Sequence, residues 1–369
     1  MAVAATVVTI GNDSALSAIA PAGTFKGTTL YWDEVGAIQL QASVADADYL
    51  GAGDVTGTAS ATVGRFLPDH FDAVPNSPTL RTGCSTFTYM GQDFDYLTVP
   101  VVTATAKSVQ GTTTQNYTGS WFQISAADLT GLAFDSNAPA GTALSPSAPT
   151  TPSVVESAPG VATITFQNDA LEFTRNSSPI APFEAEIELR LNVFDSDSVA
   201  ATNPVTLGGV SAGTGIGFTS LKWLRFGRLA FENAHGSELL TLAVPLRAEY
   251  YNGLGFETNT SDACTVLGGA DPPPDLELTP NPGGLSTTAS VGNLTLVLGL
   301  ADLTLSPTVA GTTGYFDLVF DVTTATGIDT PWLLFDWDGD GSHDDKPTGR
   351  ATFGIYRAHD MIIHTREIY

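Results

Sequence analysis

The strongest constraint on the fold is a strict two-residue alternation between residues 183 and 193. Apolar side chains occupy every second position, and charged side chains stand between them. A period of two is that of a β-strand with one buried and one solvated face, and a helix cannot satisfy it. The intervening charged row is typical of a solvated face rather than of a catalytic carboxylate pair. The apolar positions are Phe183, Ala185, Ile187, Leu189, Leu191 and Val193, and the charged ones are Glu184, Glu186, Glu188 and Arg190.

Short apolar runs separated by turn residues fill the rest of the chain. The 369 residues include 37 glycines and 22 prolines, and no stretch of useful length has a helical apolar period. This pattern predicts an all-β protein with two or three immunoglobulin-like sandwiches in series. Its boundaries are expected at Phe66–Phe71 and within the polar, Gly-rich segment Asn203–Thr219. The predicted units are therefore 1–66, 67–204 and 205–369, and the sequence leaves open whether the first two share one core.

The charge of the chain excludes several classes of partner. The formal net charge is −25, which disfavours nucleic acid and anionic membrane surfaces because both require Lys and Arg. The same charge is compatible with divalent cations. Residues 1–6 lack the basic and apolar regions of a signal peptide, and no run has the length of a transmembrane helix. We expect a piece of a larger exported protein that carries an added Met.

The two cysteines, Cys84 and Cys264, are 180 residues apart. They are either a disulfide between distant segments or two buried free thiols. The extracellular character of the composition favours the disulfide. The chain-entropy estimate for a loop of this length is about 5 kcal/mol before any strain. Neither cysteine has a Cys or His neighbour at metal-ligand spacing, which disfavours a metal site.

An acidic stretch near the C-terminus predicts a calcium loop. Aspartates at relative positions 1, 3 and 5 with Gly at 6 place oxygen ligands around Ca²⁺ as an EF-hand loop does. Position 12, however, is Pro347 instead of Glu, and no helix pattern flanks the loop. We therefore expect a structural calcium loop between strands, on a hairpin, and the alternative is an acidic solvated turn. The candidate ligands are Asp336, Asp338, Asp340, the Ser342 carbonyl, Asp344 and Asp345.

Catalytic signals are weak. The segment Gly209–Gly213 matches the nucleophile-elbow pattern around Ser211, but no helix pattern follows it, as that elbow requires. The sequence thus predicts a protein that is not an enzyme. Trp337, which alternates with the aspartates, is the best exposed candidate for stacking on a sugar ring. His343, inside the same loop, is expected to face solvent because Ca²⁺ prefers oxygen ligands.

Several ordered segments together resemble one family. The segments are Val63–Phe71, Phe87–Gln92, Thr114–Gly119, Phe226–Leu229, Gly236–Leu239, Val244–Tyr250, Asn259–Cys264, the acidic loop and Ala351–Arg357. The resemblance covers about residues 35–369, and it is to the C-terminal domain of MshQ-like proteins, which are encoded with the mannose-sensitive haemagglutinin (MSHA) type IV pilus system of Gram-negative bacteria.

The resemblance implies an exported protein at the bacterial cell surface, with no catalytic residues to transfer. It strengthens the case for the disulfide and for calcium, because both features lie inside the resembling region. The expected function is a calcium-stabilised, non-enzymatic structural or adhesion module of a pilus-associated protein. Pilus or minor pilin subunits, or another surface protein, are the expected partners. Carbohydrate binding by this region is the alternative, and a surface hydrolase is a weaker one.

Overall fold

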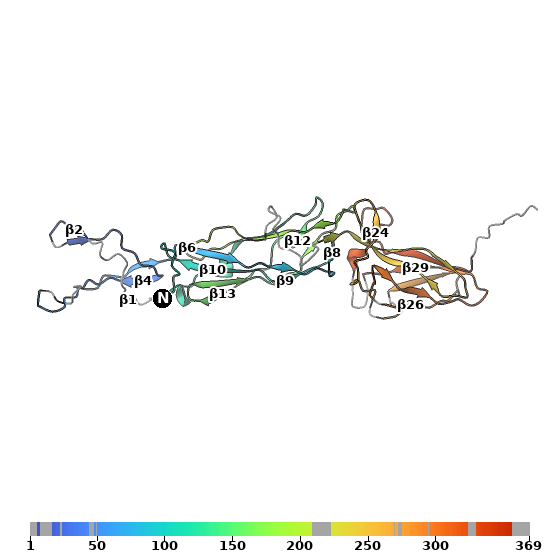
Figure 1. The fold of residues 1–369 in the computed structure, drawn as a ribbon, viewed down its shortest axis with the longest axis horizontal. Helices are drawn as coiled ribbons and strands as arrows, with labels where there is room; N and C mark the ends of the chain where they lie inside the picture. The colour runs from blue at the N-terminus through green and yellow to red at the C-terminus, as the bar shows by residue number, and fades with distance from the viewer. Residues whose placement is uncertain are drawn as a thin grey trace, which may run out of the picture.

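The computed structural model is an elongated, almost entirely β rod (Figure 1). It describes residues 6–7, 17–22, 24–43, 48, 50–208, 223–268, 270–271, 275–293, 295–323 and 330–355. The helices of the described residues are three short 3₁₀ turns, η2 (Gly119–Trp121), η3 (Ala126–Asp128) and η4 (Pro331–Leu333). No helix in these ranges is long and apolar enough to cross a membrane. The all-β prediction is confirmed.

The N-terminal strands form one end of the rod (Figure 1). A three-stranded sheet has the order β1-β4-β5, and β2 pairs with β3 in a separate hairpin. Val35 lies directly before β4 and packs into the first core, which follows in the chain. Strand β4 is therefore attached to that core. The strands are β1 (Thr6–Val7), β2 (Ser17–Ile19), β3 (Thr24–Lys26), β4 (Gly36–Gln39) and β5 (Val63–Phe66).

The first core lies between two main sheets. One has the order β13-β14-β10-β6 and the other β11-β17-β18. Their strands are β6 (His70–Pro75), β10 (Val101–Lys107), β11 (Thr130–Ser136), β13 (Ser153–Ala158), β14 (Val161–Thr165), β17 (Ile187–Asn192) and β18 (Val205–Gly208). Two smaller strand pairs extend the first core toward the second core. They are β7 (Thr79–Leu80) with β9 (Tyr96–Thr98), and β12 (Leu144–Ser145) with β15 (Glu172–Phe173).

Strand β17 shows why the alternation in the sequence specifies this core. Its apolar side chains Ile187, Leu189 and Leu191 are fully buried between the two sheets. The charged side chains between them face outward, where Arg190 pairs with Glu188 and with Asp135 of β11. A register slip by one residue would exchange these two faces, so the pairing is strongly specified.

The second core is enclosed by three sheets. Their orders are β20-β23-β24 with β27 beside β23, β21-β30-β29-β25, and β22-β28-β26. Strand β29 alternates buried and half-buried residues along its whole length, as a strand against a core should. The strands are β20 (Gly227–Phe231), β21 (Ala234–Gly236), β22 (Leu242–Ala243), β23 (Leu246–Tyr251), β24 (Phe256–Thr258), β25 (Leu276–Asn281), β26 (Ala289–Val291), β27 (Leu300–Ala301), β28 (Leu303–Leu305), β29 (Gly314–Phe320) and β30 (Thr348–Phe353).

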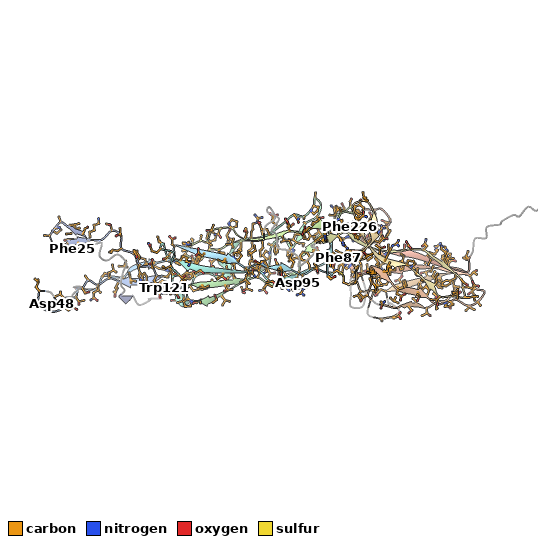
Figure 2. The ribbon with its side chains drawn as sticks, in the orientation of Figure 1. Phe25, Asp48, Phe87, Asp95, Trp121 and Phe226 are labelled. Carbon is orange, nitrogen blue, oxygen red and sulfur yellow. A yellow bond between two sulfur atoms is a disulfide. The ribbon has the colours of Figure 1, made fainter. Side chains whose placement is uncertain are left out.

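A small sheet of order β16-β19-β8 connects the two cores; we call the region around it the joint. Its strands are β8 (Phe87–Tyr89), β16 (Phe183–Glu184) and β19 (Trp223–Arg225). Phe87 and Tyr89 are buried in the second core, whereas Leu224 and Phe226 are buried in the first. Phe87 and Phe226 lie together where the two halves of the rod meet (Figure 2). The cores therefore interlock, and the predicted boundaries after 66 and 204 stay predictions.

One secondary-structure expectation is wrong. The sequence predicts that a strand leads into the acidic loop, but in the apolar run Trp332–Phe335 before the loop the first two residues belong to η4. Pro331 at the start of this turn fixes a φ that suits a helical first turn and supplies no N–H to a sheet. The loop is therefore preceded by a 3₁₀ turn rather than by a hairpin strand.

Candidate functional site

The acidic loop, residues 336–345, is closed by one antiparallel bridge. The backbone N–H of Phe335 donates to the Asp345 carbonyl at 3.3 Å, and the Asp345 N–H donates to the Phe335 carbonyl at 3.1 Å. Phe335 packs against the first core, although the loop follows strands of the second core. The sequence predicts this loop on a hairpin, and the structure places it at the joint, against the first core.

The carboxylates of the loop accept hydrogen bonds from its own backbone. Asp336 accepts from the N–H groups of Gly339, Asp340 and Gly341, at 2.7 to 3.0 Å. Asp345 accepts from those of Trp337 and Asp338, at 2.8 and 3.1 Å. These bonds fold the ten residues around the carboxylates and offset part of their mutual repulsion.

Three of the six predicted ligands converge. Carboxylate oxygens of Asp336, Asp338 and Asp345 all lie within 4.8 Å of one another. Two oxygens on one Ca²⁺, each at about 2.4 Å, can be at most about 4.8 Å apart, so these three fit a shared ion. The other predicted carboxylate ligands, Asp340 and Asp344, are outside this group, and the predicted role of the Ser342 carbonyl stays a prediction. Among the described residues, none of the five aspartates forms an ion pair with Lys, Arg or His. Calcium itself remains a prediction.

His343 connects the loop to the first core, so the expectation that it faces solvent is wrong. Its ring is half-buried, stacks on Phe335 with centroids 5.7 Å apart, and meets the edge of Phe226 at 5.2 Å. Its Nε2 lies 3.1 Å from the carbonyl oxygen of Asn176. Burial, and then the nearby Arg175 charge, lower the pKa of His343 below its ordinary value, which favours the neutral ring at pH 7.

Arg175 is the central polar contact of the joint. It follows β15 of the first core, and its guanidinium donates to the carbonyls of Leu334 at 2.6 Å and Gly227 at 2.9 Å. The same guanidinium lies over the Phe226 ring, 4.5 Å from its centroid. Burial lowers the pKa of Arg175 to about 10, so the group is still charged at neutral pH. One side chain of the first core thus bonds two backbone segments of the second.

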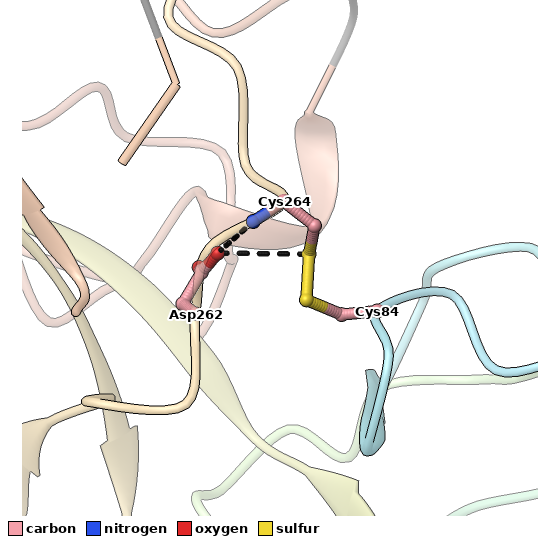
Figure 3. A group of neighbouring side chains, drawn as sticks. All are labelled: Cys84, Asp262 and Cys264. Carbon is pink, nitrogen blue, oxygen red and sulfur yellow. Dashed lines mark hydrogen bonds between the residues drawn. A yellow bond between two sulfur atoms is a disulfide. The ribbon is translucent and has the colours of Figure 1, made fainter. Parts of the chain in front are cut away.

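The disulfide lies on the same joint. Cys84, just before β8, is joined to Cys264, after β24, with Cα atoms 5.7 Å apart (Figure 3). Of the two alternatives that the sequence left open, the structure has the disulfide. Asp262 lies beside it and accepts from the backbone N–H of Cys264 at 3.1 Å. Asp262 with the two cysteines does not form a metal site here, because both sulfurs are in the disulfide.

A buried polar network continues from the disulfide into the joint. The hydroxyl of Tyr89 donates to Asp262 at 2.8 Å and accepts from the Asn259 amide at 2.7 Å. Thr265 donates to Asp262 through its hydroxyl and its backbone N–H. Tyr89, Asn259 and Asp262 are fully buried, and burial raises the pKa of Tyr89 well above its ordinary value. Buried polar groups satisfied in this way specify one arrangement of the two cores.

Trp337, the predicted sugar platform, is 43% exposed. Its ring packs on Phe335 with centroids 5.1 Å apart, and the Arg228 guanidinium lies 4.6 Å from its centroid. Arg228 in turn pairs with Glu249 at 2.8 Å, so it is fixed in place. One side of Trp337 is therefore already occupied. The predicted elbow serine, Ser211, lies outside the described residues, so it stays untested.

The sequence analysis missed the residues that build the joint. Arg175 and Arg225 stand in no motif, and Asp262 reads as part of a polar turn. The only sequence signal of the two arginines is scarcity, because Lys and Arg total 14 residues in a chain with 39 acidic ones. An arginine that does not lie on a solvent-facing side of a strand is therefore a candidate for a structural or binding role.

Comparisons with known proteins identify two adjacent family segments. The model of the third domain of DUF6701 matches residues 34–214, and that of the fourth domain matches residues 225–368. No curated protein matches the chain. A solved structure of FdeC, described as an Escherichia coli adhesin, is 15% identical and covers 81% of this chain and 68% of its own, with a TM-score of 0.25. A likeness that low carries no argument about fold or function. The MshQ link stays a prediction.

Proposed function

This chain belongs to the DUF6701 family, and we propose that it is a non-enzymatic structural module of a bacterial surface protein. Its task is to hold other parts of the exported chain at a fixed distance and orientation. The observation that carries this proposal is the joint, where two β-cores are connected by a disulfide, a shared sheet and a buried arginine. Two cores that moved independently would need none of these contacts.

The charge and the disulfide support an extracellular location. A net charge of −25 keeps a protein soluble and separate from other acidic surfaces. Disulfides persist in oxidising compartments such as the periplasm and the cell exterior. Within this proposal, pilus or minor pilin subunits, or another surface protein of a Gram-negative cell, are the partners that the sequence resemblance suggests.

Calcium is the second part of the proposal. An ion bound by Asp336, Asp338 and Asp345 would stiffen the loop that supports Phe335 and His343 against the first core. The ion would thus strengthen the joint instead of a distal tip. Calcium ligands of this type are oxygens at 2.3–2.6 Å, and the backbone carbonyls of the loop and water can complete the shell.

Small-angle X-ray scattering on the purified chain tests the rigid rod. We expect the scattering curve calculated from the structure to fit the data without bending at the joint. A maximum dimension that requires a broad ensemble of bent shapes would contradict the proposal. Surface biotinylation of cells that express the full-length parent protein tests its location, and protection of the intact protein from a membrane-impermeant reagent would refute it.

Calcium binding is tested with two matched variants. Asp338→Asn keeps the size of the side chain and its hydrogen bond from the Asp340 N–H, but it removes one converging charge. Asp344→Asn removes the same charge outside the converging group. We expect calcium to raise the melting temperature of the wild type and of Asp344→Asn, and to have a much smaller effect on Asp338→Asn. Equal melting temperatures of the wild type in calcium and in chelator would show that the loop is only an acidic turn.

A further inference from the structure

An open pocket of about 340 Å³ lies at the seam between the two cores, on the β19 side of the joint. Ala181 and Pro182, which precede β16, line it together with Tyr250 and Asn252 at the end of β23. Trp223 and Arg225 of β19 lie between them. This volume is at the lower end of the range for small-ligand pockets, which suits one sugar ring better than a larger ligand.

The alternation of strand β19 places an aromatic ring and a cation side by side. Leu224 is fully buried, so Trp223 and Arg225 on either side of it share the opposite face. Two residues along a strand are separated by about 7 Å, close to the width of a pyranose ring with one ring substituent. Trp223 is 38% exposed although it is one of the largest apolar side chains. An exposed indole beside a cation is a platform on which the apolar face of a sugar can stack.

The Arg225 guanidinium is fixed before any ligand arrives. It lies between the Phe87 ring, at 4.7 Å from the centroid, and the Tyr250 ring, at 4.5 Å. One terminal nitrogen donates to the Asn259 side-chain oxygen. Its Nε is buried, so it does not reach the pocket, and it has no hydrogen-bond partner within the described part of the chain. The charged guanidinium can pair with a carboxylate, and among the described residues that line this pocket it is the only cation.

One carboxylate beside this cluster is already engaged, and a second, Glu184, is the cross-strand partner of Trp223. Glu257 accepts hydrogen bonds from the Tyr250 hydroxyl and, at 2.9 Å, from the Asn252 amide, and it does not line the pocket. Gly253, next to Asn252, approaches the first core so closely that a Cβ there would lie 3.2 Å from the Cβ of Ala181. The pocket is therefore complete only when the two cores are docked.

The geometry points to this pocket as a binding subsite for a pyranose ring that carries a carboxylate, such as a uronic acid or sialic acid residue of a surface glycan. The ring stacks on Trp223, and the carboxylate accepts from Arg225. The inference adds a ligand class to the proposed surface role and rests on that role only for the expectation that glycans are the available ligands.

The test uses the intact chain with ¹⁵N-labelled tryptophan and follows the five indole N–H signals by NMR. The probes are methyl β-D-glucuronide and its neutral counterpart, methyl β-D-glucoside, each at up to about 20 mM, a range that detects millimolar affinity. Trp223→Phe assigns the Trp223 signal. We expect the glucuronide to shift that signal, and the glucoside to bind about tenfold more weakly because it lacks the carboxylate.

Two variants and a control complete the design. Trp223→Ala abolishes the binding, and Arg225→Lys weakens it about tenfold because a flexible ammonium does not reproduce the guanidinium held between Phe87 and Tyr250. Trp337→Ala, which removes the other exposed tryptophan, leaves it unchanged. Circular dichroism and melting curves confirm that each variant folds. No shift of the Trp223 signal with the glucuronide, equal affinity for both probes, or a shift confined to Trp337 would each overturn the inference. None of these outcomes bears on the proposal that the chain is a rigid rod, which small-angle X-ray scattering tests separately.

Discussion

Replacing Arg175 with methionine tests the joint most directly. Methionine fills a similar length of the buried site but supplies no donor, so the carbonyls of Leu334 and Gly227 lose their side-chain partner. The contact with the Phe226 ring loses its charge as well. The two hydrogen bonds join the first core to the second, so the variant weakens the joint while both cores keep their own sheets.

The magnitude follows from three contributions. Two hydrogen bonds from a charged donor contribute about 3–6 kcal/mol together. The cation–π contact adds about 1 kcal/mol. Burial of the charge opposes them, because it lowers the pKa of Arg175 to about 10, which corresponds to about 3 kcal/mol. We therefore expect Arg175→Met to lose about 1–4 kcal/mol of unfolding free energy, and the loss to concern the coupling of the two cores.

Differential scanning calorimetry measures this effect as cooperativity. We expect the wild type to unfold in one transition and Arg175→Met to separate into two, with the lower one at reduced temperature. Arg81→Met is the control, because Arg81 is 59% exposed and forms a surface pair with Asp95, which contributes at most about 1 kcal/mol. A single transition in Arg175→Met, at the temperature of the control, would refute the assigned role.

Three further predictions concern buried groups at neutral and extreme pH and the disulfide. Burial raises the pKa of Tyr96 above its ordinary 10.0, so stability present below pH 10 is lost as pH rises above it. In urea unfolding, raising the pH above 10 should lower the unfolding free energy less in Tyr96→Phe than in the wild type, and by the same amount in the exposed control Tyr31→Phe. At pH 7 both variants should be as stable as the wild type. The pKa of His343 is lower in the folded protein than its ordinary value, so the unfolded chain takes up this proton at a higher pH than the folded chain does. The unfolding free energy therefore falls as the pH drops below about 6.5. In His343→Gln the melting temperature should no longer fall with acid in this way, and a fall equal to that of the wild type would contradict the prediction. Replacing Cys84 and Cys264 with serine should lower the unfolding free energy by up to about 5 kcal/mol, and a loss under about 1 kcal/mol would show that the unfolded chain gains little freedom.

The sequence predicted those features that depend on local pattern. The alternation at 183–193 specifies a strand and its buried face because strand geometry has a period of two. The spacing of the aspartates predicts a loop folded around carboxylates, and Asp336 and Asp345 do organise the backbone in that way. Both features need only near neighbours in the chain, so the residues themselves carry the information.

The joint was beyond such reasoning because its contacts join residues far apart in the chain. Arg175 meets Leu334 across 159 residues, and Tyr89 meets Asp262 across 173. No periodicity marks either pair, since each residue is a single polar side chain in an irregular segment. For the same reason the sequence does not predict that the acidic loop lies at the joint. Its position depends on contacts with distant residues, such as the packing of Phe335 on the first core.

The joint depends on contacts of different chemistry, and this bears on how stiff the rod can be. If only the connecting chain joined two cores, bending would break no bond. Here β8 and β19 are hydrogen-bonded in one sheet, Trp223 opposite Phe87 and Arg225 opposite Tyr89, and each strand supplies apolar residues to a different core. Bending the rod must therefore separate a sheet and expose both cores at once. The disulfide and Arg175 add to a joint that is already closed by packing, so reduction of the disulfide alone lowers its stability without opening it. Stiffness of this origin is intrinsic to the fold, and an ion in the acidic loop would adjust it rather than create it.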